Sequence, residues 1–328
     1  MPQRVTRRTC QSFSSVAFLV RRASPSFLRA NCCQPPRHAC TAFLRTRHST
    51  YGVRMRPIKW LSTRAKNCRI VNRKEYSFSF SGAGFLSPFH IGVVQALQEE
   101  GLLTKKSKLA GASGGALVAA STVCGISPSE QMLAYKEITR SCRTAGFLGR
   151  VRGTLLESLE AGLPPNAHDL ANESLTVAVM RIWPTFQLQP ELLHHFHSRQ
   201  DLLDSLLASS HLPLYLDSAQ PFWTRFRAGL YVDGGLIDLV PPVPDAIKVC
   251  VLPGHFLFRD DLHVTPHLLG STYPFSLQQT MQWAFVAPPD DVADELLRMG
   301  HQAAIKWVQS GCIQESRGID ASAEEGNN

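Results

Sequence analysis

The sequence of 328 residues predicts an α/β fold with a mostly parallel central sheet. Strand-like and helical segments alternate along residues 75–312, and this alternation is typical of parallel sheets covered by helices. Glycine-rich turns stand where predicted strands lead into helices. The hydrophobic content of 44% is enough for the buried core that such a sheet requires.

The first predicted unit is a strand, a glycine turn and a helix. Polar and aromatic residues alternate over 75–81, which is the spacing of a strand. Gly82-Ala83-Gly84 follows as the turn. The next segment, 89–100, has apolar residues at helical intervals and is followed by Gly101, a residue type that ends helices well.

The same order repeats downstream. A glycine-rich turn over 111–115 precedes a small-residue helix predicted over 116–124. The segment 145–172 contains scattered Gly and Pro residues and is predicted to be a loop or lid near the site. Periodicity and composition predict further helices over 128–141 (with Ser127 as N-cap), 192–209 and 291–309, and strands over 175–182, 229–232 and 246–252.

The charge is divided unevenly along the chain. Residues 1–74 contain 14 Arg, 3 Lys and no acidic residue, so this leader carries +17. Since the whole chain carries +8, the remainder carries −9, which argues against a single nucleic-acid-binding surface. We therefore expect a basic, disordered leader over 1–74, a catalytic domain over 75–312 and a polar, disordered tail over 313–328.

The composition of the leader is typical of an organelle transit peptide, because it is rich in Arg, Ser and Thr and lacks acidic residues. A plastid or mitochondrial location is therefore predicted. The alternatives are a disordered basic tail or an untranslated extension, with the protein in the cytoplasm or at a lipid-droplet or membrane surface. No apolar run of about 18 residues occurs, so no transmembrane helix is predicted.

Gly111-x-Ser113-x-Gly115 has the pattern of a nucleophile elbow, in which a serine occupies a tight turn between a strand and a helix. Small neighbours give the backbone the room that such a turn needs, and the following helix directs its positive end at the serine oxygen. An ordinary glycine turn is the alternative that the motif alone leaves open.

Gly82-Ala83-Gly84 can present backbone N–H groups to a cleft without obstruction by side chains. Such donors can stabilise the negative charge that forms on a carbonyl oxygen during ester attack. The alternative is a dinucleotide phosphate loop, but Ser87 stands where the third glycine of that fingerprint belongs.

Asp233-Gly234-Gly235 follows an apolar strand, so its carboxylate can reach a cleft shared with other loops. A simple Asp-Gly hairpin turn is the competing interpretation. A conventional triad would also need a histidine after the acid, for which His255 and His267 are candidates by chain order.

Taken in order, these turns resemble the motifs of the patatin-like phospholipases. The segments 81–92 (SGAGFLSPFHIG), 111–115 (GASGG) and 231–235 (YVDGG) carry the resemblance, and 208–213 (ASSHLP) is also similar. The likeness spans residues 76–253 and is greatest to the branch that contains adipose triglyceride lipase and adiponutrin. It implies a three-layer α/β/α sandwich around the predicted sheet.

The resemblance also implies a catalytic dyad without histidine. Ser113 is then the nucleophile and Asp233 the proton acceptor. The N–H groups of Gly82, Ala83 and Gly84 form the oxyanion hole, although plant patatins have glycine at the position of Ala83. Ser87 and Pro88 replace residues that are often basic or glycine, which puts contact with a phosphate headgroup there in doubt. The supporting glycines are Gly111, Gly115, Gly234 and Gly235.

The function that follows is cleavage of carboxylic esters in phospholipids, galactolipids or acylglycerols through an acyl-enzyme. The alternatives are a lipid acyltransferase with the same dyad and a non-catalytic lipid-binding regulator. No metal, cofactor or nucleic acid is expected. We expect peripheral contact with a membrane or lipid droplet, in which Phe147, Phe222, Trp223 and Phe226 either dip into the interface or pack in the core.

Overall fold

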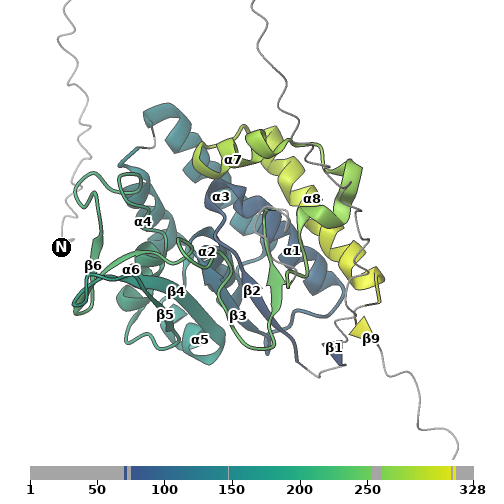
Figure 1. Cartoon of the computed structure of the whole chain (residues 1–328), viewed down its shortest axis with the longest axis horizontal. Helices are drawn as coiled ribbons and strands as arrows, with labels where there is room; N and C mark the ends of the chain where they lie inside the picture. The colour runs from purple at the N-terminus through teal and green to yellow at the C-terminus, as the bar shows by residue number, and fades with distance from the viewer. Residues whose placement is uncertain (1–69, 72–74, 147, 253–260, 312, 315–328) are drawn as a thin grey trace, which may run out of the picture. The chain divides into compact units, whose positions relative to one another are not determined.

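Figure 1 shows the computed structural model of the chain. The structure describes residues 70–71, 75–146, 148–252, 261–311 and 313–314. Apart from residues 70–71, the predicted transit peptide lies outside these ranges, and the domain boundaries at 74 and 312 stay predictions. Within the described ranges, no helix has both the length and the apolar run needed to cross a membrane.

Among the described residues, seven strands form one mixed sheet in the order β6-β7-β4-β3-β2-β8, with β5 paired to β4 off this path. The run β8-β2-β3-β4 is parallel, whereas β5, β6 and β7 pair in antiparallel fashion. The strands are β2 (Ser77–Phe80), β3 (Lys108–Ala112), β4 (Leu175–Arg181), β5 (Gln189–Leu193), β6 (Thr224–Phe226), β7 (Gly229–Asp233) and β8 (Ile247–Val249).

Helices flank this sheet, so the predicted α/β fold with a mostly parallel sheet is confirmed. α2 packs on β3 and β4, and α6 packs on β4, β6 and β7. The helices are η1 (Gly84–Leu86), α1 (Ser87–Glu99), α2 (Gly114–Val123), α3 (Pro128–Ala145), α4 (Val151–Gly162), α5 (Ala167–Ser174), α6 (Arg199–Ser209), η3 (Pro266–Thr272), α7 (Leu277–Phe285) and α8 (Asp290–Gln309).

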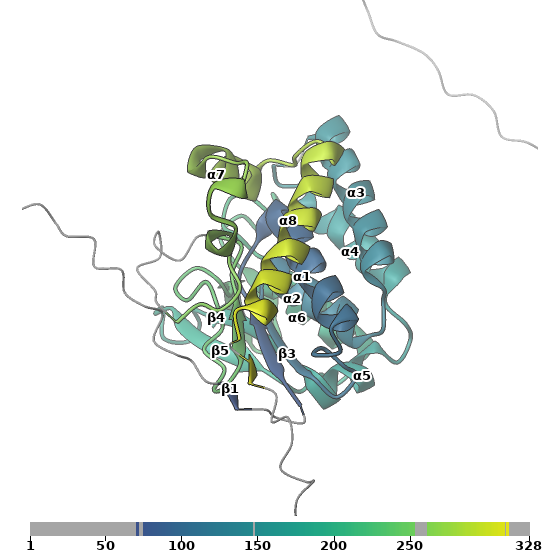
Figure 2. The ribbon, with the colours of Figure 1, turned by 90° about the vertical axis from the view of Figure 1, so that its right-hand side faces the viewer.

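The last helix, α8, lies alongside α1, as Figure 2 shows. Two glycines let their backbones approach: a Cβ at Gly92 would lie 2.0 Å from the Leu297 carbonyl oxygen, and one at Gly300 would lie 1.9 Å from that of Phe89. A second, two-stranded parallel sheet joins β1 (Ile70–Val71) to β9 (Ile313–Gln314). These short strands come from the segments predicted as leader and tail.

Two predictions about local structure are wrong. The segment 145–172 is not a loop, because α4 and α5 occupy most of it. Val151, Leu155 and Leu159 recur at four-residue intervals and are buried, and this apolar stripe outweighs the scattered Gly and Pro residues.

The helix predicted over 192–209 begins later than expected. Its first two residues end β5, and α6 starts at Arg199 because the Ser198 hydroxyl accepts a hydrogen bond from the Asp201 N–H. His194, His195 and His197 therefore lie on the connection before α6 and not on a helix face. By contrast, Ser127 caps α3 as predicted, within a full capping box.

Candidate active site

Ser113 occupies a strained turn between β3 and α2. Its φ of 50° and ψ of −127° lie in a region that residues other than glycine rarely adopt. The turn is closely packed: a Cβ at Gly115 would lie 2.3 Å from the Ser81 carbonyl oxygen, and one at Gly111 would lie 2.4 Å from that of Gly115. This is the geometry that a nucleophile elbow requires, with the serine at the start of a helix.

Strand β4 aligns the two predicted catalytic residues. β3 and β7 pair with the same edge of β4, since β5 occupies the opposite edge over Val177–Arg181. β3 runs parallel to β4 and its last residue, Ala112, pairs with Ala178. β7 arrives from the other direction and its last residue, Asp233, pairs with the next residue, Val179. The two strands therefore meet end to end, which brings Ser113 and Asp233 together.

The Asp233 carboxylate is buried, with 5% of the residue exposed. Burial raises the pKa of Asp233 from 3.8 to about 6, and hydrogen bonds from the Ser113 hydroxyl and the Gly235 N–H partly oppose this shift. The Gly235 N–H lies 2.7 Å from Oδ1. A carboxylate with this pKa is a stronger base than an exposed aspartate and remains mostly ionised at pH 7.

The Asp233-Gly234 turn is not a hairpin. The strand that follows β7 is β8, which pairs with β2 on the far side of the sheet. A Cβ at Gly234 would lie 2.0 Å from the Ala178 carbonyl oxygen, so the chain passes directly against β4 at this point. The glycine is needed for that contact, and the hairpin interpretation of this motif does not hold.

The loop after β2 lies beside the elbow, because β2 and β3 are parallel neighbours. The Gly82 N–H donates to the Leu239 carbonyl oxygen at 2.8 Å. Within the described residues, the N–H groups of Ala83 and Gly84 have no acceptor. Of the three donors predicted for an oxyanion hole, Ala83 and Gly84 are thus available, while Gly82 holds the loop in place.

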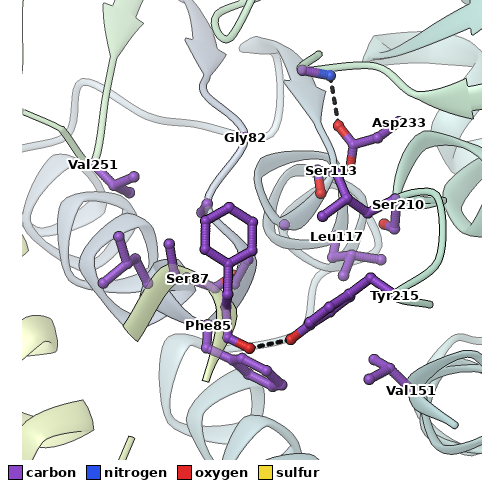
Figure 3. A pocket seen from close by; sticks show the side chains of 18 of the residues that line it. Gly82, Phe85, Ser87, Ser113, Leu117, Val151, Ser210, Tyr215, Asp233 and Val251 are labelled. Carbon is purple, nitrogen blue, oxygen red and sulfur yellow. Dashed lines mark hydrogen bonds between the residues drawn. The ribbon is translucent and has the colours of Figure 1, made fainter. Parts of the chain in front are cut away.

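A cavity of about 340 Å³ opens over these groups (Figure 3). The Tyr135 hydroxyl, on its wall, donates to the Phe85 carbonyl oxygen at 2.7 Å, and the Ser87 hydroxyl to that of Gly84 at the same distance. The Ser210 hydroxyl has no partner within the described part of the chain. Apolar lining residues include Leu86, Leu117, Ile138, Val151, Leu155, Leu212, Leu216, Leu239, Val251 and Ala284.

Two groups of residues at the cavity, called the floor and the mouth, differ in their polarity and exposure. The floor consists of Ser113, Asp233 and the free N–H groups of Ala83 and Gly84. The mouth consists of four apolar residues of which 40–60% is exposed: Leu236 and Ile237 after the Asp233 turn, and Met281 and Phe285 on α7. All of these except Ile237 line the cavity.

No histidine is among the described residues that line the cavity. Of the two candidates for a triad, His267 lies in η3 and His255 falls outside the described residues. His90 is buried, its Nε2 lies 3.0 Å from the Ser81 carbonyl oxygen, and burial lowers its pKa to about 4. It packs against the rings of Phe80 and Phe89 as a neutral side chain.

The aromatic residues predicted near a lipid interface differ in their exposure to solvent. Phe222 and Trp223 are exposed, whereas Phe226 is buried and packs on Tyr231. Phe147 lies outside the described residues. Across the described part of the chain, no three His, Cys, Asp or Glu side chains are grouped as a metal site would require.

Comparison with known proteins finds relatives among the patatin-like phospholipase domain-containing proteins. Patatin-like phospholipase domain-containing protein 2 of Mus musculus is 31% identical over 255 residues, which are 72% of this chain and 50% of that protein. Protein 4 of the same series, from Homo sapiens, is 32% identical over 209 residues, 60% of this chain and 77% of that protein.

The 1-acylglycerol-3-phosphate O-acyltransferase PNPLA3 of Homo sapiens is 26% identical over 270 residues, 76% of this chain and 54% of that protein. The chain thus spans about half the length of this relative and of the Mus musculus protein. The model of the patatin-like phospholipase family matches residues 78–246, which include all three turns. The chain belongs to the patatin-like phospholipase family, and its relatives agree with the adiponutrin branch.

Proposed function

We propose that the protein is a lipid acyl hydrolase that cleaves carboxylic esters through an acyl-enzyme on Ser113, with Asp233 as the base. The observation that carries this proposal is the placement of the Ser113 hydroxyl beside the buried, basic carboxylate of Asp233 at the floor of an apolar cavity, as Figure 3 shows. Membership of a family of phospholipases supports the same chemistry.

In the first half of the reaction, Ser113 Oγ attacks the carbonyl carbon of the ester and its proton passes to Asp233. The negative charge that forms on the carbonyl oxygen is stabilised by the N–H groups of Ala83 and Gly84 and by the positive end of α2. The bond to the alcohol then breaks, and the departing oxygen takes the proton from Asp233.

In the second half, water attacks the acyl-enzyme and gives its proton to Asp233. Collapse of the second tetrahedral intermediate releases the fatty acid, and Ser113 Oγ regains its proton from the carboxyl group. The apolar walls suit an acyl chain, which would exclude bulk water from the floor. The substrates that fit are esters of phospholipids, galactolipids or acylglycerols.

A second activity is favoured by one comparison. A relative is named as an acyltransferase that acts on 1-acylglycerol-3-phosphate. If a lipid alcohol takes the place of water in the second half, the same dyad transfers the acyl group instead of releasing it. Product analysis in the presence of a monoacyl lipid separates the two activities, since transfer yields a diacyl product and hydrolysis yields a free acid.

The mouth supports contact with a lipid surface. Three of its exposed apolar side chains, Leu236, Met281 and Phe285, line the cavity, and the fourth, Ile237, follows Leu236 directly in the sequence. Burial of such side chains in a lipid interface is favourable, so docking there would present the cavity directly to the acyl chains.

The direct test is Ser113→Ala. We expect the variant to fold as the wild type does and to lose ester hydrolysis by about 10⁴-fold or more, because the nucleophile is removed. A fluorophosphonate probe should label the wild type at Ser113 and leave the variant unlabelled. Wild-type turnover by Ser113→Ala on a short-chain nitrophenyl ester would refute the proposal.

A further inference from the structure

Ser209, the last residue of α6, makes hydrogen bonds to Ser113 and to Gly234, the residue after Asp233. Its side chain is fully buried and does not line the cavity. Its hydroxyl accepts a hydrogen bond from the Ser113 N–H at 2.9 Å and donates one to the Ala178 carbonyl oxygen of β4 at 2.7 Å. One hydroxyl thus connects the elbow to the strand that aligns the site.

The backbone of Ser209 makes the second connection. The carbonyl groups at the end of a helix have no partner within the helix. Here the Ser209 carbonyl accepts a hydrogen bond from the Gly234 N–H at 3.0 Å, and the His211 carbonyl accepts one from the Asp233 N–H at 2.9 Å. The end of α6 therefore holds the aspartate turn as well as the elbow.

The bond to Ser113 has a consequence for the strained turn. A residue held at a positive φ without being glycine relaxes unless its surroundings over-determine it. The Ser113 N–H would also lose its acceptor if the turn changed conformation. The Ser209 hydroxyl thus opposes any rotation that would carry Ser113 Oγ away from Asp233.

We propose that Ser209 is a positioning residue that fixes the position of Ser113 relative to Asp233. Its hydroxyl holds the elbow and its carbonyl group holds the aspartate turn. This inference rests on the proposed function, since the relative position of the two residues affects turnover only if they act as a catalytic dyad. Small displacements of reacting groups can cost about 100-fold in rate, so loss of the hydroxyl should be visible in turnover.

The chain supplies a matched control on the same helix. Ser205 is one turn before Ser209 and equally buried, but its hydroxyl donates to the Asp201 carbonyl oxygen within α6 itself, at 2.6 Å. Replacement of either serine by alanine removes one buried hydroxyl from α6. Only Ser209→Ala removes a bond to the candidate dyad.

The experiment compares Ser209→Ala with Ser205→Ala in three measurements: steady-state hydrolysis of a soluble short-chain ester, thermal unfolding, and hydrogen exchange of the peptides that contain Ser113 and Gly234. For Ser209→Ala we expect kcat to fall about 10- to 100-fold with KM within about 2-fold of wild type. Exchange at the elbow should accelerate at least about 10-fold because the Ser113 N–H loses its acceptor. Ser205→Ala should change neither kcat nor exchange at the elbow.

Two comparisons separate positioning from a loss of stability. In the Asp233→Asn background, Ser209→Ala should lower the residual rate by less than about 3-fold, because the dyad it positions is already disabled. Ser209→Cys, which keeps the shape of the side chain with a weaker hydrogen-bonding group, should give an intermediate kcat even if the alanine variant folds poorly.

Two outcomes would overturn the inference: a kcat for Ser209→Ala within 2-fold of that for Ser205→Ala, or unchanged exchange at the elbow. If the wild type neither hydrolyses esters nor reacts with a fluorophosphonate, the proposed function fails. Exchange then decides separately whether Ser209 holds the elbow, since that measurement needs no activity.

Discussion

At the floor of the cavity, Ser113 and Asp233 are held by hydrogen bonds to backbone and buried groups, whereas at the mouth Ile237 and Phe285 expose apolar side chains to solvent. The floor requires atoms at fixed positions, because bond making depends on distance and direction. The mouth requires only apolar surface, because the free energy gained when apolar side chains leave water does not depend on their exact orientation. Substitutions at the floor should therefore slow the hydrolysis of every ester. Substitutions at the mouth should slow only the hydrolysis of aggregated lipids.

The largest effect expected in this comparison is that of Asp233→Asn. The variant keeps the shape of the side chain and its acceptor for the Gly235 N–H but cannot take a proton. We expect kcat/KM to fall about 10²- to 10⁴-fold on soluble and aggregated esters alike, which is the range for loss of a general base. A loss confined to aggregated lipid would assign Asp233 to binding and not to catalysis.

The same variant should be more stable than the wild type at neutral pH. The pKa of Asp233 is raised from 3.8 to about 6 in the folded state. The carboxyl group therefore destabilises the fold as pH rises from about 4 to 6, by up to about 3 kcal/mol above pH 6, and has no such effect where it is protonated in both states. Unfolding at pH 8 should show Asp233→Asn stabilised, and the difference should shrink toward zero as the pH falls below about 4, where the carboxyl group becomes protonated in both states.

The pH dependence of the wild type is the next largest effect. The base acts only when ionised, so kcat/KM should be level above pH 7 and fall about tenfold per pH unit below the folded-state pKa of about 6. Initial rates on a soluble ester between pH 4 and 8 measure this decline. An apparent pKa near 4 in the rate profile would mean that Asp233 is not desolvated as the structure indicates.

The floor was largely predictable from sequence, and the mouth was not. The turns at 82–84, 111–115 and 233–235 need small residues at defined positions, so their backbone geometry leaves a local pattern. Met281, Phe285 and Tyr215 reach the cavity from distant segments, and nothing in their own neighbourhoods marks them. The Gly82 N–H likewise finds its acceptor on Leu239, a long-range contact that no motif encodes.

At the mouth, Ile237→Asp should weaken docking to lipid without harm to the floor. Loss of one apolar contact and gain of a charge should reduce binding to lipid vesicles and hydrolysis of vesicle lipid roughly 5- to 20-fold. Turnover of a soluble ester should stay within about 2-fold. The matched control is Leu133→Asp on α3, an apolar residue of similar exposure that is not part of the mouth. Equal losses for the two variants would remove the mouth from the docking surface.

The smallest expected effect lies between floor and mouth, at Ser210. Its hydroxyl is buried and has no partner within the described part of the chain, and the residue lines the cavity, so the hydroxyl can donate to the polar end of a bound ester. Loss of one neutral hydrogen bond is worth about 0.5–1.5 kcal/mol. Ser210→Ala should therefore lower kcat/KM about 2- to 10-fold, chiefly through KM, with no change in the pH profile. If Ser210→Ala instead matches Ser205→Ala in every kinetic constant, the polar end of the substrate does not bind at Ser210. The wall of the cavity next to the floor would then contribute apolar contact to binding, as the mouth does, and no directional hydrogen bond.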